Sequence, residues 1–384
     1  MSWAKAKIGN HCEITSSKRI FYSEYTDSGV PFYRSKEIIE LSQGQPISEP
    51  LYISAEKYNE IKSKFGVPMP GDMLLTSVGT IGVPYIVCQD DYFYFKDGNL
   101  TWFRNFDNSL LSRFLYYWIG SKDGYGVLNN STIGSSQKAL TISSLKQIEC
   151  PLPPIKVQEH IVDVLSAYDD LIENNQKQIK LLEEAAQRLY KEWFIDLRFP
   201  GYENTPIVDG VPEGWNKVGM DTIAPIVTGK KDANFGAPNG KYLFFTCAQE
   251  PIKAPSYSFD CDAVILAGNG DFNVKLYRGQ FEAYQRTYVF SPYESKHLYL
   301  LYHAVRESMR QLFQGASGST IKFLTKHMLE NIAVFVPDKD TLNAFSRVCD
   351  AIQQKNECLR AQIIFSQEAR DRLLPKLMSG EIEV

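Results

Sequence analysis

The chain has 384 residues. This is about two and a half times the length of an average domain, so we expect two domains. Hydrophobic residues make up 44% of the chain and aromatic residues 13%, a composition that excludes a disordered or fibrous protein. The net charge of −4 argues against a protein that coats nucleic acid non-specifically, although it leaves room for one that reads DNA beside basic partners.

The sequence predicts a protein of the reducing cytoplasm. The N-terminal stretch up to Lys7 lacks the apolar run of a signal peptide, and no segment is apolar for long enough to cross a membrane. The chain has seven cysteines, which is an odd number, and none of them forms a Cys-x-x-Cys pair. We therefore expect reduced thiols.

The chain contains an internal duplication. Residues 134–194 match residues 318–378 without a gap, and roughly a quarter of the aligned positions are identical. Upstream the match is looser, and it aligns the stretch that begins at Asn99 with the stretch that begins at Gln285. The pattern predicts a variable region followed by a constant segment, and this unit occurs twice.

Residues 1–150, the first variable region, are predicted to be an α+β domain. Short alternating segments such as Thr101-Trp102-Phe103 are typical of strands. Residues 110–119 have the spacing of an amphipathic helix. Basic and acidic residues are equal in number in this region.

A long helix is predicted within residues 151–198, after a run of prolines that are tolerated only in the first turn of a helix. Its apolar residues alternate at spacings of four and three, which is the heptad seam of a coiled coil. At about 1.5 Å per residue this helix spans roughly 50 Å and needs a partner along its seam. Its seam residues are Ile161, Leu165, Tyr168, Ile172, Asn175, Ile179, Leu182 and Leu189.

Residues 199–335 predict a second α+β domain. Residues 286–290 are expected to form a strand and residues 296–313 an amphipathic helix. Basic and acidic residues balance here as well, so the net negative charge of the chain lies on the two helical segments. A balanced domain can still present a local basic face.

Residues 336–384 predict a second long helix, with Pro375 expected to disturb its last turn and Gly380 to end it. We expect the two helices to pair with each other in antiparallel orientation. Asn175 and Asn356 are predicted to face each other, because a buried amide at a seam position prefers an amide opposite. The seam residues of the second helix are Phe345, Ile352, Asn356, Leu359, Ile363 and Leu373.

The chain lacks recognisable catalytic motifs. Gly79 and Gly82 form a lone glycine pair, and Pro153-Pro154 lacks the aromatic residue that completes the base-clamping motif of a DNA methyltransferase. Gly229-Lys230 lacks the rest of a nucleotide-binding loop, and the histidines show no zinc-ligand spacing. Turns and surface positions explain these residues better than catalysis does.

Polar side chains that suit DNA occur in both variable regions. Arg commonly reads guanine and Asn or Gln reads adenine, whereas Ser, Thr and Lys mostly contact phosphates. An isolated basic residue is more often solvated surface, but Lys138 and Lys322 each follow a Gly-Ser turn (Gly134-Ser135 and Gly318-Ser319) at the same repeat position. The candidates are Arg34, Lys36, Thr76, Ser77, Thr80, Lys96, Asn99 and Lys138 in the first region, and Lys230, Lys231, Asn269, Arg278, Gln285, Arg286 and Lys322 in the second.

Four short stretches, together with the alternating order of variable regions and long helices, carry a family resemblance. They are Pro151-Leu152-Pro153-Pro154 with Gln158-Glu159, then Trp193-Phe194, then Pro212-Glu213-Gly214-Trp215, and finally the tail from Leu373 to Ile382. In this order of parts the whole chain resembles the specificity (S) subunit of a type I restriction–modification system.

The resemblance implies that residues 1–150 and 199–335 are target recognition domains, each of which reads one half of a split DNA sequence. It implies a pseudo-two-fold arrangement in which residues 151–198 and 336–384 form an antiparallel spacer. The spacer would fix the gap between the half-sites and dock two methyltransferase (M) subunits. Restriction (R) subunits, which are ATP-driven translocases with a nuclease, would then join the complex.

The family's S subunit is non-catalytic and holds no cofactor or metal. S-adenosylmethionine, with which the M subunits methylate adenine N6, belongs to the partner subunits, as do ATP and magnesium. The resemblance therefore implies a cytoplasmic, prokaryotic protein whose partners are double-stranded DNA, M subunits and R subunits, with no role at a membrane.

The second copy departs from the family pattern, because Leu342-Asn343 stands where Gln158-Glu159 stands in the first. We therefore expect the two docking surfaces to differ in strength. Two alternatives remain open at the level of sequence. One is a coiled-coil protein-interaction scaffold without sequence-specific DNA binding, and the other is a methyltransferase in its own right.

Overall fold

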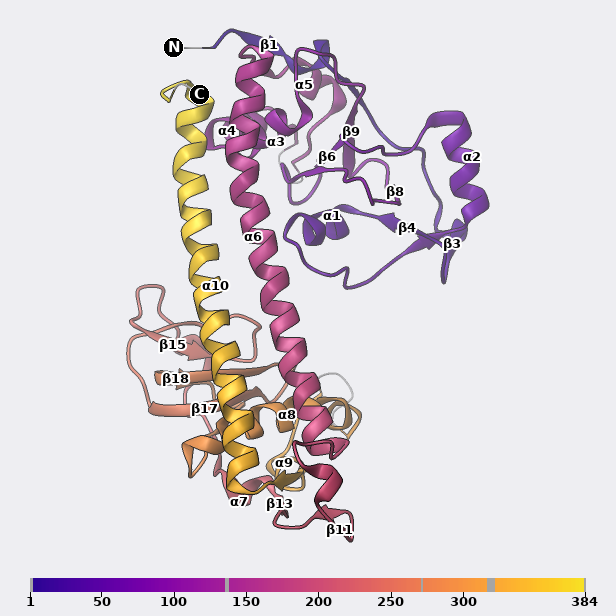
Figure 1. Cartoon of the computed structure of the whole chain (residues 1–384). Coiled ribbons are helices and arrows are strands. Elements are labelled where there is room, and N and C mark those ends of the chain that lie inside the picture. Colours follow the sequence, from indigo (N-terminus) through magenta and orange to yellow (C-terminus); the bar gives the residue numbers. More distant parts are fainter. Residues whose placement is uncertain (1–2, 135–137, 271, 316–321, 383–384) are drawn as a thin grey trace. The chain divides into compact units, whose positions relative to one another are not determined.

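The chain folds into two units, which a computed structural model describes over residues 3–134, 138–270, 272–315 and 322–382 (Figure 1). Residues 1–176 and 361–384 form the first unit, and residues 177–360 form the second. The part of the first unit that precedes its long helix is called the first domain, and the part of the second unit between the two long helices is called the second domain. Of the predicted Gly-Ser turns, Ser135, Gly318 and Ser319 lie outside the described residues.

The first domain is α+β and contains two four-stranded sheets. The antiparallel sheet in the order β2-β9-β6-β7 comprises β2 (Glu13–Thr15), β9 (Leu100–Arg104), β6 (Met73–Thr76) and β7 (Pro84–Ile86). The other comprises, in spatial order, β3 (Tyr25–Thr26), β5 (Tyr52–Ile53), β4 (Val30–Tyr33) and β8 (Tyr94–Phe95). A separate pair joins β1 (Lys5–Lys7) to β10 (Glu149–Pro151).

Five α-helices complete the described part of the first domain. They are α1 (Ser35–Ser42), α2 (Ala55–Phe65), α3 (Ser112–Gly120), α4 (Lys122–Asn130) and α5 (Ile142–Gln147). The strand predicted at 101–103 is confirmed as part of β9, and the helix predicted at 110–119 is confirmed as α3.

The core of the first unit joins the β2-β9-β6-β7 sheet to α3 and to the long helices. Phe103 from the sheet and Phe114 from α3 are both fully buried in one cluster. Ile161 and Leu165 from the first long helix and Leu377 from the second belong to the same cluster. Packing of these apolar side chains, rather than polar contacts alone, therefore fixes the first domain on its part of the helices.

The second domain is built around a six-stranded sheet in the order β14-β19-β17-β18-β15-β16. In that order its strands are β14 (Ile226–Thr228), β19 (Thr287–Phe290), β17 (Phe259–Ala267), β18 (Val274–Ala283), β15 (Tyr242–Phe245) and β16 (Ile252–Ala254). Neighbouring strands are antiparallel except for β15 and β18, which are parallel.

Smaller elements surround this sheet. They are the strand pairs β11 (Ile207–Val208) with β12 (Val211–Pro212) and β13 (Asn216–Gly219) with β20 (Ala333–Val336), and the helices α7 (Met220–Ile223), α8 (Leu298–Gly315) and α9 (Lys326–Glu330). The strand predicted at 286–290 is confirmed as β19, and the helix predicted at 296–313 is confirmed as α8.

The duplication is confirmed at the level of the backbone. The pair β1–β10 aligns Ala6 with Cys150, and the pair β13–β20 aligns Val218 with Val334 at the matching repeat position. The four strands β2-β9-β6-β7 have the same order and antiparallel pairing as β14-β19-β17-β18. A threonine side chain, at Thr141 or Thr325, accepts a backbone hydrogen bond at the start of α5 and of α9. Both domains therefore share one framework.

The two long helices are α6 (Ile155–Tyr190), which continues into a π-helical turn at Lys191–Ile195, and α10 (Lys339–Ser379). Asp338 caps the N-terminus of α10, because its Oδ1 accepts a hydrogen bond of 2.9 Å from the backbone N–H of Thr341. The helix continues through Pro375, so the expected disturbance there does not end it. It ends before Gly380, whose φ of 71° suits a residue without a side chain.

In the first unit, α6 and α10 run antiparallel. Arg370 Nη1 donates to Asp169 Oδ1 at 2.6 Å, and Asn175 Nδ2 donates to Gln362 Oε1 at 3.3 Å, so one residue number rises as the other falls. Asn175 therefore bonds to Gln362 and not to Asn356 as predicted, and the buried Oδ1 of Asn356 has no hydrogen-bond partner among the described residues. A heptad pattern marks the seam of each helix but does not determine which position of the partner lies opposite.

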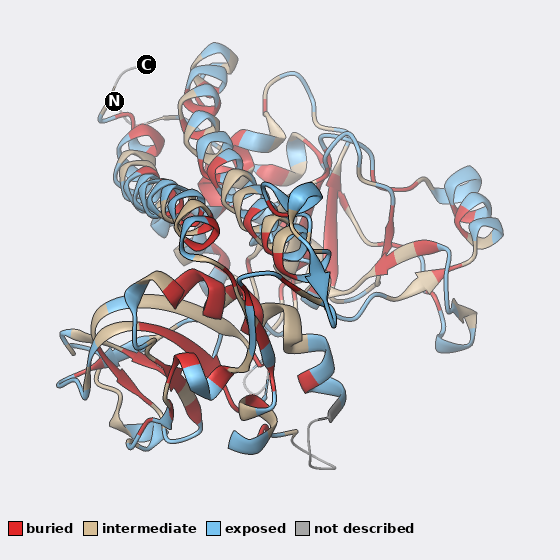
Figure 2. Cartoon of the chain, turned by 60° about the horizontal axis from the view of Figure 1, so that its bottom comes forward, coloured by how far each residue is buried: buried red, intermediate tan, exposed pale blue. Residues whose placement is uncertain are grey.

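In the second unit, the antiparallel orientation is the same. Arg360 Nη2 donates to Glu183 Oε1 at 2.9 Å, and the ring centroids of Trp193 and Phe345 lie 6.0 Å apart. None of the fourteen predicted seam residues is exposed. Figure 2 shows that each long helix has buried residues on one side and exposed residues on the other.

The described residues include neither a candidate membrane-spanning helix nor a disulfide. No helix among them combines the length and the apolar composition that crossing a membrane requires. The seven cysteines are free. Burial raises the pKa of Cys12, Cys150 and Cys349 to about 12, so these three thiols stay protonated and pack as small apolar groups.

Candidate nucleic-acid interface

In the first domain, three segments meet where β6 ends and β9 begins. The backbone N–H of Ser77 donates to the carbonyl of Asn99 at 2.8 Å, and the carbonyl of Ser77 accepts from the N–H of Leu140 at 2.9 Å. An antiparallel bridge between Val78 and Ala139 extends this contact. We call this meeting point the first-domain edge. The predicted residues Thr80 and Lys138 lie exposed in its loops.

Two other predicted residues at this edge face inward. Thr76 is fully buried, and its Oγ1 accepts a hydrogen bond of 2.9 Å from the backbone N–H of Val83. Ser77 is also buried, and its Oγ lies 2.7 Å from Oγ1 of Thr101. In this structure both hydroxyls hold the loop after β6 and are not presented to a ligand.

The cations predicted near α1 are paired within the domain. Arg34 Nη2 lies 2.5 Å from Oε1 of the buried Glu37, and the hydrogen bonds that the guanidinium donates to Glu37 raise its pKa. Lys36 Nζ lies 3.1 Å from Oε2 of Glu49, an exposed ion pair of small energy. Lys96 is half-buried directly after β8.

In the second domain, the three equivalent segments meet where β17 ends and β19 begins. The N–H of Gly268 donates to the carbonyl of Arg286 at 2.8 Å, and the carbonyl of Gly268 accepts from the N–H of Leu324 at 2.8 Å. Asn269 and Phe323 form the corresponding antiparallel bridge. We call this meeting point the second-domain edge, and it brings together predicted residues from four separate loops.

Several polar side chains at the second-domain edge are already engaged. Gln285 Nε2 donates to Asp232 Oδ1 at 2.8 Å, and its backbone N–H donates to the carbonyl of Lys231 at 2.9 Å. Lys231 Nζ lies 4.4 Å from the centroid of the Phe235 ring, a cation–π contact. The neighbouring Lys230 is exposed.

A hollow of about 360 Å³ opens at the second-domain edge. Its lining residues are Thr228, Gly268, Gln285, Arg286, Tyr288, Phe323 and Leu324. A side chain at Gly268 would lie 2.4 Å from the carbonyl of Arg286 and 2.9 Å from the Tyr288 ring, so only glycine fits there. Lys322 borders this region and donates to the carbonyl of Phe313 at 3.3 Å.

Arg278, by contrast, lies away from this edge. Its Nη1 donates to Asp350 Oδ1 on α10 at 3.1 Å, and its Nη2 donates to the hydroxyl of Tyr299 at 3.0 Å. That hydroxyl donates to the same Asp350 oxygen at 2.8 Å, which lowers the pKa of Asp350. Arg278 thus fastens the six-stranded sheet to α10 within the second unit, a structural role that its sequence context does not reveal.

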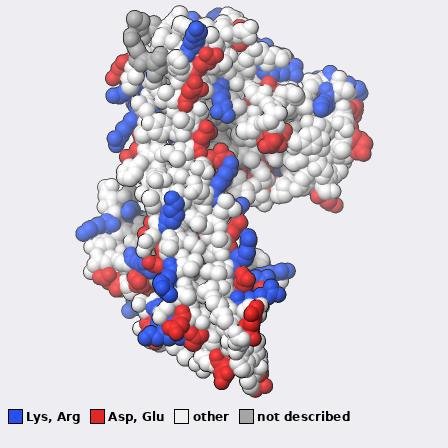
Figure 3. Space-filling model, in the orientation of Figure 1, with Lys and Arg blue, Asp and Glu red and all other residues white. Residues whose placement is uncertain are grey.

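The charge on the surface is mixed. On the face shown in Figure 3, Lys and Arg side chains alternate with Asp and Glu, and neither sign forms a continuous patch. Within the described parts of the chain, no group of three or more His, Cys, Asp or Glu residues could hold a metal ion.

The two edges correct the sequence alignment by one residue. The loose upstream match aligned Asn99 with Gln285, but the shared hydrogen bonds place Asn99 at the position of Arg286. The strands agree, because Ile14 pairs with Phe103 on β9 as Ile226 pairs with Phe290 on β19. Loops of unequal length hid this register, and only the strand pairing reveals it.

The two domains share one framework, present exposed polar loops at the same edge and pack on a segment of paired helices, an arrangement that suits a protein with two binding sites. The described residues contain two exposed polar edges, an apolar core in each unit and a helical support. Comparison with known proteins shows which family the first half of the chain matches.

The family described as "Type I restriction modification DNA specificity domain" matches residues 1–184. The type I restriction enzyme MjaIX specificity subunit of Methanocaldococcus jannaschii is 26% identical over 429 residues, covering 100% of this chain and 94% of that protein. The EcoDI specificity subunit of Escherichia coli is 34% identical over 176 residues, covering 45% of this chain and 39% of that protein.

A solved structure agrees with the fold. The S subunit of a type I restriction–modification system from M. genitalium has a TM-score of 0.59 and 15% sequence identity, covering 98% of this chain and 96% of that one. Residues 1–184 therefore match the DNA specificity domain of type I restriction–modification systems, and the whole chain is similar to a specificity subunit. The α+β fold of the chain, with two domains and long antiparallel helices, is the one that the resemblance implied.

Proposed function

We propose that the chain is the DNA sequence-specificity subunit of a type I restriction–modification complex, and that each domain reads one half of a bipartite target. The observation that carries this proposal is the shared framework of the two edges. The same backbone hydrogen bonds hold Asn99 in one domain and Arg286 in the other. One framework that presents different side chains suits a target whose two halves have different sequences.

The neutral domains are expected to bind DNA weakly by themselves. Affinity for DNA comes largely from cations that neutralise phosphates, and basic and acidic residues balance in each variable region. Exposed lysines at the edges, Lys138 and Lys230, suit phosphate contacts that position the domain. Strong binding then requires partner subunits that supply further positive charge and enclose the DNA.

The long helices are proposed to set the distance between the half-sites. A helix of this length spans roughly 50 Å, and successive turns of the major groove lie about 34 Å apart. Ion pairs such as Asp169–Arg370 and Glu183–Arg360 join the helices along their length. A rigid helical pair suits a fixed spacer, whereas a flexible linker would tolerate several spacings.

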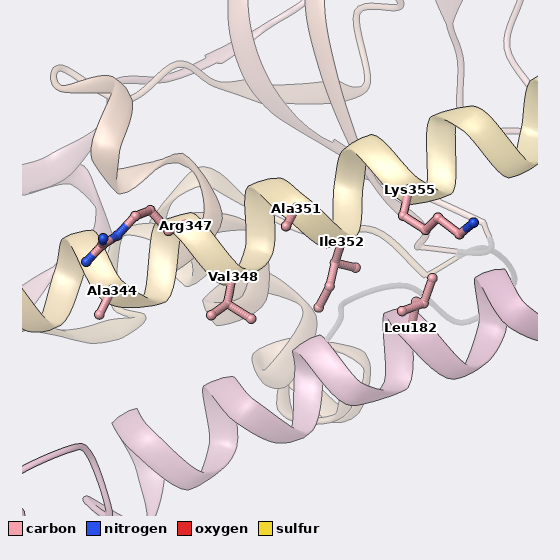
Figure 4. A pocket seen from close by; sticks show the side chains of 7 residues that line it. All are labelled: Leu182, Ala344, Arg347, Val348, Ala351, Ile352 and Lys355. Atoms are coloured by element: carbon pink, nitrogen blue, oxygen red, sulfur yellow. The ribbon is translucent and has the colours of Figure 1, made fainter.

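The helix pair also offers a surface for a protein partner. In the second unit, α6 and α10 enclose a shallow groove of about 640 Å³ (Figure 4). It is lined by Leu182, Ala344, Arg347, Val348, Ala351, Ile352 and Lys355. Its apolar floor and two cationic side chains suit an M subunit that presents an apolar side chain and a carboxylate.

The first unit presents a different surface at the corresponding repeat positions. Val164 corresponds to Val348, but Asp163 stands where Arg347 stands in the second unit. The charge beside the apolar position is therefore reversed. We propose that two M subunits dock with unequal strength, and that the second unit prefers the more acidic surface of the partner.

The chain is proposed to act without a cofactor of its own. S-adenosylmethionine would enter with the M subunits, which methylate adenine N6, and ATP and magnesium with the R subunits. The complex would work in the prokaryotic cytoplasm, where its double-stranded DNA substrate lies. The chain's own residues would select the site and hold the enzymes beside it.

Sequencing of methylated DNA tests this proposal directly. The chain and its M subunit are expressed together in a host that lacks adenine methylation, and the modified sites are aligned. We expect one motif with two unlike halves and a constant spacer. A contiguous motif, or methylation without sequence preference, would contradict the proposal, and a protein-interaction scaffold predicts no motif at all.

The spacer role has its own test. Seven residues that continue the heptads are inserted both after Gln176 and after Arg360, which lie in the paired region of α6 and α10. At about 1.5 Å per residue this adds roughly 10 Å, or about three base pairs. We expect a longer spacer with both half-sequences kept. An unchanged spacer would show that the helices do not set the distance.

A further inference from the structure

Asn99 and Arg286 occupy the same position in the two domains, and two independent comparisons agree on this. The carbonyl of each residue accepts a hydrogen bond of 2.8 Å from the backbone N–H of the residue directly after β6 or β17, which is Ser77 or Gly268. Each also stands directly before its strand, β9 or β19. The backbone position is the same in both domains, but the side chain differs. If the two domains recognise different bases, such a position is a candidate for the difference.

The side chains of both residues are free among the described residues. Neither the amide of Asn99 nor the guanidinium of Arg286 makes a hydrogen bond or ion pair with another described side chain. Arg286 is exposed and Asn99 is half-buried. The adjacent Gln285 differs, because Asp232 holds its amide at 2.8 Å. The guanidinium of Arg286 is therefore more available to bind a ligand than the amide of Gln285.

The surroundings of the two positions differ in a way that suits different bases. In the first domain, Ser77 and Thr101 hydrogen-bond to each other and fill the space behind the edge. In the second domain, Gly268 and Tyr288 take these places and leave a hollow beside Arg286. The longer Arg286 side chain therefore has room beside it, whereas the shorter Asn99 is backed by packed side chains.

We propose that Asn99 and Arg286 are the corresponding specificity-determining residues of the two domains. Asn99 reads an adenine in one half-site, because a carboxamide can pair with adenine N6 and N7 at once. Arg286 reads a guanine in the other, because a guanidinium can pair with guanine O6 and N7 at once. This inference rests on the proposed function and names the residues that carry it out.

The test uses the full chain in complex with its M subunit. Arg286→Asn and Arg286→Ala are compared with Lys230→Ala, a matched loss of an exposed cation at the same edge. DNA sequencing of methylated sites identifies the motif of each variant. Competition binding with targets that carry single-base changes measures discrimination at each position of both half-sites.

For the wild-type complex, we expect replacement of one guanine in one half-site to weaken binding by about 5- to 140-fold. Arg286→Ala should lose this discrimination at that single position, and Arg286→Asn should shift the preference there towards adenine. The other half-site and the spacer should stay the same. Lys230→Ala should weaken binding to all sequences equally and reduce its salt dependence.

Asn99→Ala supplies the second half of the test, with relaxed discrimination expected at one adenine of the opposite half-site. If Arg286→Ala and Asn99→Ala keep every base preference of the wild type, the assignment is overturned while the proposed function stands. A wild-type complex without a bipartite motif would instead overturn the proposed function. Circular dichroism of each variant separates loss of reading from loss of folding.

Discussion

The hydroxyl of Tyr117 on α3 donates a hydrogen bond of 2.6 Å to Oδ2 of Asp169 on α6. The other oxygen of the same carboxylate accepts a bond of 2.6 Å from Arg370 on α10. One side chain therefore links the first domain to both long helices within the first unit. Burial and the bond to Asp169 raise the pKa of Tyr117, so its hydroxyl remains a donor throughout the physiological range.

Tyr117→Phe should lower the free energy of unfolding of the first unit by about 1.5 to 3 kcal/mol, because it removes a hydrogen bond to a charged acceptor. Urea unfolding followed by circular dichroism measures this change. Tyr116→Phe is the matched control, because no hydrogen bond from the Tyr116 hydroxyl is found among the described residues. Equal stabilities of the two variants would show that the Asp169 link contributes nothing.

Gln158→Leu should destabilise the first unit although leucine occupies the corresponding position, Leu342, in the second. The buried amide of Gln158 accepts from Leu111 N–H at 2.9 Å and donates to the carbonyls of Ser109 and Pro153. Leucine would leave these backbone groups unpaired, which costs about 2 to 4 kcal/mol in total.

Thermal unfolding measures the effect of Gln158→Leu, with Gln176→Leu as its control. Gln176 lies on the same helix but is exposed, so its substitution should change stability by less than about 0.5 kcal/mol. If the two variants unfold at the same temperature, the buried amide does not hold α6 to the loop before α3.

Local periodicity explains what the sequence could predict. The strand that contains Trp102, the helix that contains Phe114 and the seam through Ile161 and Leu165 all follow from the spacing of apolar residues. The spacing of apolar residues shows which face of a helix or strand is buried. It is the same whatever part of the protein packs against that face. Such predictions therefore need no knowledge of the tertiary structure.

The roles of polar residues depend on partners that are distant in sequence, and the sequence does not determine them. Arg278 is predicted from the sequence to contact DNA, but its guanidinium donates a hydrogen bond to Asp350. Thr76 faces inward because the loop after β6 needs its hydroxyl. The relation of Asn99 to Arg286 depends on strand register, which loops of unequal length conceal in the loose upstream alignment.

The stability of the second unit should fall as the pH is lowered below the ordinary pKa of histidine. His303 is buried, with its Nδ1 2.8 Å from Oε1 of Gln187, and burial with the nearby Arg306 lowers its pKa to about 3. The unfolded chain therefore binds a proton at pH 5 that the folded chain does not. Stability is thus present above pH 6.5 and is lost progressively as the pH falls towards 3.

Between pH 7 and pH 5, the wild type should lose about 2 kcal/mol more than His303→Gln, which removes the titrating group. Urea unfolding of both proteins at the two pH values measures the difference. Because other groups titrate alike in both proteins, only the change between them is informative. A parallel loss in wild type and variant would contradict the role of His303.

Asn356→Leu should raise the free energy of unfolding by about 1 kcal/mol. The buried Oδ1 of Asn356 has no hydrogen-bond partner in the described parts of the chain, so the native side chain retains a desolvation cost that leucine lacks. Asn175→Leu is the comparison, because it removes the bond to Gln362 and should stabilise less. Chemical unfolding ranks the three proteins, and a less stable Asn356→Leu would indicate that this amide has a role in the fold.

Val348→Asp should prevent one M subunit from binding while the chain stays folded. Val348 is 44% exposed on the apolar floor of the α6–α10 groove, so the substitution itself should cost little stability. A carboxylate there would be desolvated against the apolar side chain of a partner, which should weaken that contact at least tenfold. Native mass spectrometry should then detect one bound M subunit in place of two. Val208→Asp, at an exposed valine on β11 outside the groove, should leave two bound, and a Val348→Asp complex that also keeps two would place the docking surface elsewhere.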